Sequence, residues 1–206
     1  RPVRVVDLGA NVDSSADQLF QFALMGSIVA EAVSGIESPT VGLLNIGEEE
    51  NKGNETVRQA AAILTDSPFI NYHGYVEGND FFSGAVDVIT CDGFVGNVAL
   101  KAIEGAVRFV GANLQQGFKK NLLTLISGLP ALPVMKKVKE SMDPRQYNGA
   151  SLVGLNGVVI KSHGAADRVA FLTAIEEAIA EIDKNIPHLI KTKMAIVVDK
   201  MEQGHV

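Results

Sequence analysis

Short apolar runs alternate along this chain with segments in which apolar residues recur at helical spacing. The apolar runs at residues 3–8, 40–46, 69–76, 86–90 and 158–161 have the length of buried strands. One helix is predicted to begin at Ser15, where Gln18 completes a capping box, and to end at Gly35. Strands that alternate with helices predict βαβ units, so the fold class is α/β with a mostly parallel sheet.

Composition excludes several classes of protein. The 206 residues are 47% hydrophobic, which is enough for one domain with a sizeable core. The net charge of −6 has the wrong sign for a general nucleic-acid binder, so no nucleic-acid partner is expected. The single cysteine, Cys91, forms no internal disulfide, which fits a cytoplasmic protein. No apolar run reaches the roughly 20 residues that span a bilayer, and no His/Cys/Asp cluster has metal-ligand spacing, so no metal is expected.

Three polar loops follow predicted strands, at residues 47–54, 91–97 and 162–167. In parallel sheets, ligands bind beyond the carboxyl ends of the strands, where loops meet helix N-termini. The functional residues are therefore expected in these loops.

The first loop ends in Lys52-Gly53-Asn54, directly before a predicted helix. A lysine charge beside the free N–H groups of a helix N-terminus suits a phosphate anion. Asn54 is equally suited to be the N-cap of that helix, and a solvated, charged loop is the alternative interpretation of the whole segment.

The second loop carries Gly93, Gly96 and Asn97 between a strand and a helix. The two glycines allow the backbone to approach a ligand closely, and Asn97 is expected at the helix start, where the helix dipole favours an anion. A structural turn with Asn97 as its cap is the alternative.

Cys91, at the start of this loop, is predicted to be a small buried residue at a strand end. A nucleophilic thiolate would need a nearby base such as His73 or His163, and the neighbouring Asp92 raises a thiol pKa. Covalent catalysis is the minor alternative.

The third loop runs from Lys161, at a strand end, through His163 to Asp167, which is suited to cap the next helix. His163 has the chemistry of a proton carrier near neutral pH. A structural histidine is the alternative.

Residues 118–149 do not follow the alternation of predicted strands and helices seen elsewhere in the chain. The apolar residues of this stretch are interrupted by Gly128, Pro130 and Pro133 and are bracketed by lysines. This pattern predicts a helical excursion from the main sheet.

Several strings together resemble the bacterial phosphate acyltransferases of phospholipid synthesis. They occur in that family's order and spacing and cover most of the chain: Val5-Val6-Asp7-Leu8-Gly9-Ala10-Asn11-Val12-Asp13, Leu43-Leu44-Asn45-Ile46-Gly47-Glu48-Glu49, Lys52-Gly53-Asn54, Cys91-Asp92-Gly93-Phe94-Val95-Gly96-Asn97-Val98-Ala99-Leu100-Lys101, Tyr147-Asn148-Gly149-Ala150 and Val159-Ile160-Lys161-Ser162-His163-Gly164. The family's opening strand and its Asp-Ala-Met-Gly-Gly-Asp-like turn are absent. This agrees with a chain that opens on Arg1-Pro2 directly before an apolar run, for which a processed terminus is the alternative.

The resemblance implies that residues 1–206 are the C-terminal part of a single acyltransferase domain. It implies a three-layer sandwich like that of phosphate acetyltransferases and isopropylmalate dehydrogenases. The implied reaction moves a long acyl chain from acyl carrier protein to inorganic phosphate without a cofactor, and a membrane glycerol-3-phosphate acyltransferase uses the acyl phosphate. The family typically forms dimers and associates peripherally with the inner face of the cell membrane.

On this basis, Lys52 is predicted to hold phosphate. Asn97, with the N–H groups of the Gly93–Asn97 turn that includes Gly96, is predicted to donate to phosphate or to the developing oxyanion. Asn54 is added to the predicted phosphate contacts. Lys161 and His163 are predicted to anchor anions or handle protons. Membrane contact is predicted for four residues of the excursion, for which a buried dimer hairpin is the alternative: Leu122, Leu125, Ile126 and Leu129. The lysines of this stretch and Arg145 are also suited to attract an acidic carrier protein.

Three rival functions stay open. A phosphate acetyl- or butyryltransferase acting on coenzyme A thioesters would share the fold and the loops. An isopropylmalate-type dehydrogenase would need carboxylates that converge on a divalent metal, and Asp87 and Asp92 lack a convincing third ligand. A non-catalytic membrane scaffold would keep the excursion without needing Lys52 and Asn97.

Overall fold

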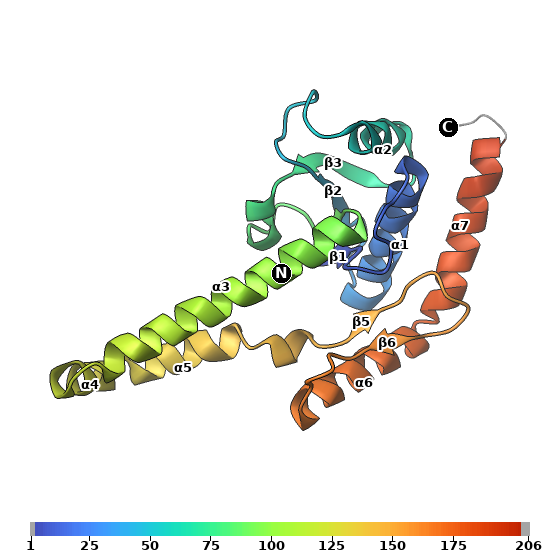
Figure 1. Ribbon diagram of the computed structural model, residues 1–206. Coiled ribbons are helices and arrows are strands. Elements are labelled where there is room, and N and C mark those ends of the chain that lie inside the picture. Colours follow the sequence, from blue (N-terminus) through green and yellow to red (C-terminus); the bar gives the residue numbers. More distant parts are fainter. Residues whose placement is uncertain (1–2, 203–206) are drawn as a thin grey trace.

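A parallel sheet forms the centre of the molecule. The computed structural model describes residues 3–202, so the expectation drawn from Arg1-Pro2 lies outside the described residues. The strands β1 (Arg4–Val6), β2 (Thr40–Leu44), β3 (Asn71–Val76) and β4 (Val88–Thr90) are arranged in the order β1-β4-β2-β3 and all run parallel (Figure 1). The α/β fold class is confirmed.

Helices cover both faces of this sheet. On one face, α1 (Ala16–Ser34) and α2 (Glu55–Asp66) pack against the strands, and α7 (Ile186–Glu202) lies outside α1. On the other face, Ala99 and Ile103 of α3 (Gly93–Lys119) pack with Phe81 of the 3-10 helix η1 (Gly78–Phe82). The result is the expected three-layer arrangement of helices, sheet and helix.

The apolar pattern of α1 places it in the core, because nearly the whole helix is buried from Leu19 to Ala30. Its start confirms the predicted capping box, in which the Ser15 hydroxyl accepts from the Gln18 N–H at 3.2 Å and the Gln18 side chain accepts from the Ser15 N–H at 2.8 Å. Its end at Gly35 is also confirmed, with a left-handed φ of 68° that favours glycine.

The predicted strand at 158–161 does not join the parallel sheet. Only Ile160–Lys161 forms a strand, β6, and it pairs antiparallel with β5 (Ala150–Ser151). The short connection between β5 and β6 explains why these two strands pair antiparallel, because a parallel crossover needs about a dozen residues or more, usually with a helix, whereas an antiparallel pair can be joined by a few. The connection turns at Gly154, whose φ is 87°, and the Leu152 N–H donates to the Val159 carbonyl at 2.9 Å.

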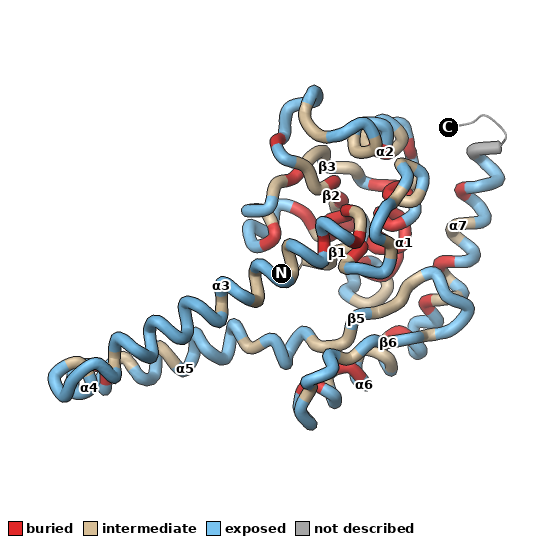
Figure 2. Tube along the Cα trace, in the orientation of Figure 1, coloured by how far each residue is buried: buried red, intermediate tan, exposed pale blue. Residues whose placement is uncertain are grey.

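The helical excursion is confirmed, but it begins earlier than expected, within α3. We define the arm as residues 105–147, which comprise the distal part of α3, α4 (Leu122–Gly128), η2 (Leu129–Ala131), α5 (Leu132–Ser141) and η3 (Pro144–Tyr147). Figure 1 shows the arm extending away from the sheet, and Figure 2 shows it almost wholly exposed. At its far end α4 folds back onto α3, where Phe118 packs against Gly128.

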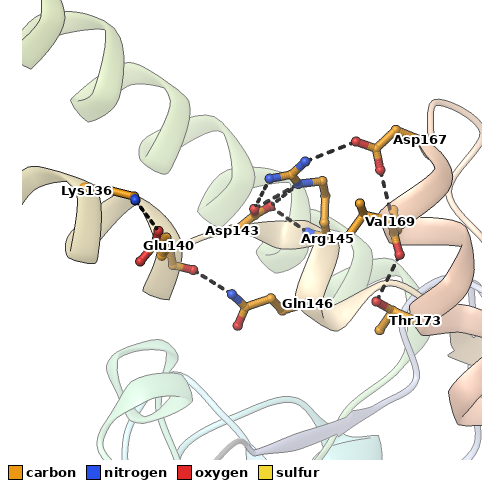
Figure 3. A network of polar contacts seen from close by, with 9 residues as sticks. Lys136, Glu140, Asp143, Arg145, Gln146, Asp167, Val169 and Thr173 are labelled. Atoms are coloured by element: carbon orange, nitrogen blue, oxygen red, sulfur yellow. Dashed lines mark hydrogen bonds and ion pairs between the residues drawn. The ribbon is translucent and has the colours of Figure 1, made fainter.

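The base of the arm is tied to the next helix, α6 (Arg168–Asp183), by one guanidinium (Figure 3). Arg145 donates to Asp143 at 2.6 Å and to Asp167 at 3.2 Å. Asp167 is also the N-cap of α6, as its sequence position predicts, and accepts from the Ala170 N–H at 2.9 Å.

Candidate functional site

The carboxyl edge of the sheet gathers three strand–helix loops. They follow β1, β2 and β4 and lead into α1, α2 and α3. Because β4 lies between β1 and β2, its loop is flanked by the other two. Three helix N-termini, each with partial positive charge, therefore face the same edge, which suits an anionic ligand.

The loop after β1 was not among the three loops singled out from sequence. Its centre is the Asp7 carboxylate, 8% exposed, which accepts from the N–H groups of Gly9, Ala10 and Asn11 at 2.8, 2.9 and 2.7 Å. The Asn11 side-chain amide adds a fourth bond at 2.9 Å. Burial alone raises the pKa of Asp7, but these hydrogen bonds outweigh it and hold the pKa below its usual value. An aspartate two residues before a glycine was the available signal for this tight turn.

The second loop is shorter than expected, which corrects the placement of Asn97. The helix α3 begins at Gly93, because Asp92 is its N-cap and accepts from the Val95 N–H at 2.8 Å. Asn97 therefore lies in the second turn of α3 rather than at its start. Its side chain is exposed and lies against the β1 loop, where a Cβ at Gly9 would be 3.4 Å from the Cβ of Asn97.

Gly93 and Gly96 allow α3 to approach the β1 loop. A Cβ at Gly96 would lie 1.9 Å from the carbonyl oxygen of Asp7, and one at Gly93 would lie 2.5 Å from that of Asn11. The N–H of Gly93 donates to Asn11 O at 2.8 Å and that of Gly96 to Asp92 O at 3.0 Å. Both N–H groups are thus occupied within the chain, and the glycines serve the close packing of α3.

Lys52 lies in the loop after β2, half-buried, with its stem beside Gly47. The loop is shaped by a hydrogen bond from the Lys52 N–H to Glu49 O at 2.9 Å and by Gly53, whose φ of 87° brings it against the Asn45 amide. Asn54 is confirmed as the N-cap of α2, since its side chain accepts from the Val57 N–H at 2.9 Å.

Lys161 and His163 lie apart from this edge. Both are exposed and belong to the segment of β6 that packs with α6, outside the parallel sheet. The His163 N–H donates to Asn148 Oδ1 at 2.9 Å, and His163 Nδ1 accepts from the Ala165 N–H at 3.1 Å. The structure brings Lys52 and Asn97 to one sheet edge, but no hydrogen bond among residues 3–202 joins Lys161 or His163 to them.

Cys91 is buried at the end of β4, as predicted. Burial, together with the charges of Asp92 and Asp7, raises the pKa of its thiol to about 12. The thiol donates to the Asp7 carbonyl at 3.4 Å. Such a thiol stays protonated near neutral pH and is a poor nucleophile.

The described part of the chain has neither a cluster of metal ligands nor a membrane-spanning helix. Between residues 3 and 202, no group of three or more His, Cys, Asp or Glu side chains could hold a metal ion. Over the same residues, no helix is long and apolar enough to cross a membrane.

The parallel sheet, with three strand–helix loops and helix N-termini directed to one edge, defines an α/β protein whose loop cluster suits an anionic ligand. Comparison with known proteins specifies the family: the model of the fatty acid synthesis protein family matches residues 1–189, and the chain belongs to that family.

Its relatives carry a common name. The chain is 56% identical over 190 residues to the phosphate acyltransferase of Alkalilimnicola ehrlichii, covering 92% of this chain and 55% of that protein. It is 50% identical over 202 residues to that of Coxiella burnetii, covering 98% and 59%. With the Legionella pneumophila protein it shares 53% over 201 residues, covering 98% and 58%. The chain thus spans less than two thirds of the length of these relatives.

Proposed function

We propose that this chain is the C-terminal part of a single acyltransferase domain that moves a long-chain fatty acyl group from acyl carrier protein to inorganic phosphate. The observation that carries the proposal is the sheet edge where the N-termini of α1, α2 and α3 meet the loops of Lys52 and Asn97. The name that the relatives carry supports phosphate acyl transfer.

The chemistry needs an anion held near a thioester carbonyl. A phosphate oxygen attacks the carbonyl carbon, the carbon–sulfur bond breaks, and the carrier thiol leaves with a proton while acyl phosphate forms. Phosphate is partly dianionic at neutral pH, so the main demands are positioning and stabilisation of the oxyanion. The Lys52 ammonium is assigned to phosphate, with the α2 start at Asn54 beside it, and the exposed Asn97 amide to phosphate or the oxyanion.

Lys161 and His163 are assigned supporting roles in anion anchoring and proton handling. Their exposed position on the β6 segment supports contact with an incoming carrier protein more directly than contact with the phosphate.

One assay tests the function. Thiol release from long-chain acyl carrier protein, measured on the full-length protein, is expected to depend on added phosphate. If the rate of thiol release is the same with and without phosphate, the proposal is contradicted. Equal or faster turnover with short acyl coenzyme A would assign the chain to the acetyl- or butyryltransferases.

The arm is proposed to contact the inner face of the cell membrane. There the acyl phosphate, which is both apolar and reactive, is delivered to the next enzyme. Leu122, Leu125, Ile126 and Leu129 are all at least half exposed, at 72, 50, 56 and 57%. Five lysines and no acidic residue lie between residues 119 and 139. Apolar side chains flanked by basic ones suit the headgroup region of an anionic bilayer.

Vesicle sedimentation tests the membrane contact. Leu122→Glu plus Ile126→Glu is expected to abolish binding to anionic vesicles. Ile196→Glu plus Val198→Glu, two exposed apolar residues of α7 outside the arm, is expected to leave that binding intact. Unchanged binding by the first variant contradicts the proposal.

The proposed partners follow from the same reaction. They are acyl carrier protein, attracted by the arm lysines and Arg145, inorganic phosphate, a second copy of the chain, and a membrane glycerol-3-phosphate acyltransferase that consumes the acyl phosphate. The exposed apolar residues of α6, Phe171, Ile175 and Ile179, support burial against another surface.

A further inference from the structure

The buried carboxylate of Asp7 is no hydrogen-bond partner of Lys52 or Asn97, yet it organises the loop against which Asn97 lies. Each carboxylate oxygen accepts two hydrogen bonds: Oδ1 from the N–H groups of Gly9 and Ala10, and Oδ2 from the N–H and the side-chain amide of Asn11. All four bonds fall within four residues, so the carboxylate closes a tight turn at the end of β1.

This turn is in direct contact with the start of α3. The Asn11 carbonyl accepts from the Gly93 N–H at 2.8 Å, and a Cβ at Gly93 would come within 3.0 Å of the Asp7 carboxylate. Gly9, held by Asp7 Oδ1, lies against the side chain of Asn97. The carboxylate therefore fixes both the backbone at the first residue of α3 and the surface against which Asn97 rests.

We propose that Asp7 is a positioning residue of the acyl-transfer site, which acts by holding residues 9–11 against Asn97 and the first turn of α3. The expected loss of kcat rests on the proposed function. The expected displacement of Asn97 rests on the geometry alone. The turn requires a carboxylate with two accepting oxygens. In Asp7→Asn one oxygen becomes an NH₂ group, which cannot accept the two hydrogen bonds that Asn11 donates, or the two that Gly9 and Ala10 donate.

The kinetic test is a double-mutant cycle in the full-length protein. Asp7→Asn is expected to lower kcat by about 10- to 100-fold, the range for a catalytic group displaced by an ångström or less, with a change of less than about twofold in the KM of the acyl donor. In the Asn97→Ala background the same substitution should cause no further loss, because the two residues act as a unit. The matched control, Asp13→Asn, removes an exposed carboxylate from the same segment and should leave kcat unchanged.

A second readout does not depend on turnover. The NMR signal of the Asn97 side-chain amide, assigned by its loss in Asn97→Ala, should shift in Asp7→Asn and stay in place in Asp13→Asn. If the wild-type protein shows no phosphate-dependent thiol release, the proposed function is wrong. The Asn97 amide signal still tests whether Asp7 positions Asn97, because it does not depend on turnover.

Three results would overturn the proposal: wild-type kcat in Asp7→Asn, losses that multiply with those of Asn97→Ala, or an unmoved Asn97 signal. If Asp7→Asn fails to fold, Asn11→Ala takes its place in the cycle, since it removes only the side-chain bond to Oδ2. It should then give a smaller kcat loss that also vanishes in the Asn97→Ala background.

Discussion

The N–H of Gly93 donates a 2.8 Å hydrogen bond to the carbonyl oxygen of Asn11, which fixes the first residue of α3 to the loop after β1. Two segments more than 80 residues apart in sequence thereby share one edge of the sheet. This contact holds the first turn of α3 against the loop after β1, and Asn97 in the next turn lies beside Gly9 of that loop.

The proposed site predicts large kinetic losses from two substitutions. Lys52→Ala and Asn97→Ala in the full-length protein should each lower phosphate-dependent thiol release by about a hundredfold or more, as the removal of an oxyanion donor typically does. Lys101→Ala and Asn113→Ala, exposed positions on α3, serve as controls and should keep wild-type turnover. Unchanged turnover in Lys52→Ala or Asn97→Ala contradicts its assignment.

Two glycines of α3 should respond in opposite directions to alanine. At Gly96 a Cβ would lie 1.9 Å from the Asp7 carbonyl oxygen, so Gly96→Ala should lower the free energy of unfolding by about 1–3 kcal/mol or more. Gly105 has open space around it, and Gly105→Ala should raise stability by about 0.5–1 kcal/mol through helix propensity. Thermal unfolding of both variants measures this, and equal stabilities would show that α3 moves away from the β1 loop.

Arg145 should control the base of the arm without controlling global stability. Arg145→Ala removes the bonds to Asp143 and Asp167. These bonds lie at the surface, where solvent screens ion pairs, so they contribute little to the stability of the fold. Hydrogen exchange should therefore accelerate around residues 144–147 and at the start of α6, while the melting temperature stays nearly constant. Arg108→Ala, which removes a pair within α3, should leave exchange at these segments unchanged. Unaltered exchange in Arg145→Ala would show that packing alone holds the arm base.

Cys91 gives a pH dependence with a definite sign. Its pKa rises from 9.0 in the unfolded chain to about 12 in the fold, so the folded state favours the protonated thiol. Stability from this group is complete below pH 9 and is lost as the pH rises through the interval up to about 12, because the unfolded chain ionises first. Denaturant unfolding between pH 8 and 10 should show a decline that is absent in Cys91→Ala. An identical decline in both proteins would assign the effect to other groups.

Much of the local structure was readable from the sequence because it depends on neighbouring residues. The capping box of Ser15 and Gln18, the left-handed turn at Gly35 and the caps at Asn54 and Asp167 are all satisfied within four residues of chain. The burial of Cys91 followed from its apolar strand. The start of α3 was misplaced because Asp92 competes with Asn97 as a cap, and either cap fits the local sequence.

The sequence by itself determined the α/β class, the helices and their caps, and the lysine-bracketed arm, because periodicity and capping are local properties. Only the tertiary structure decided which loops meet. The order β1-β4-β2-β3 places the Asn97 segment between those of Asp7 and Lys52, and hairpin pairing of β6 removes Lys161 and His163 from that edge. The physical reason is that strand order and the approach of Gly96 to the Asp7 carbonyl depend on packing between distant segments, which no local pattern encodes.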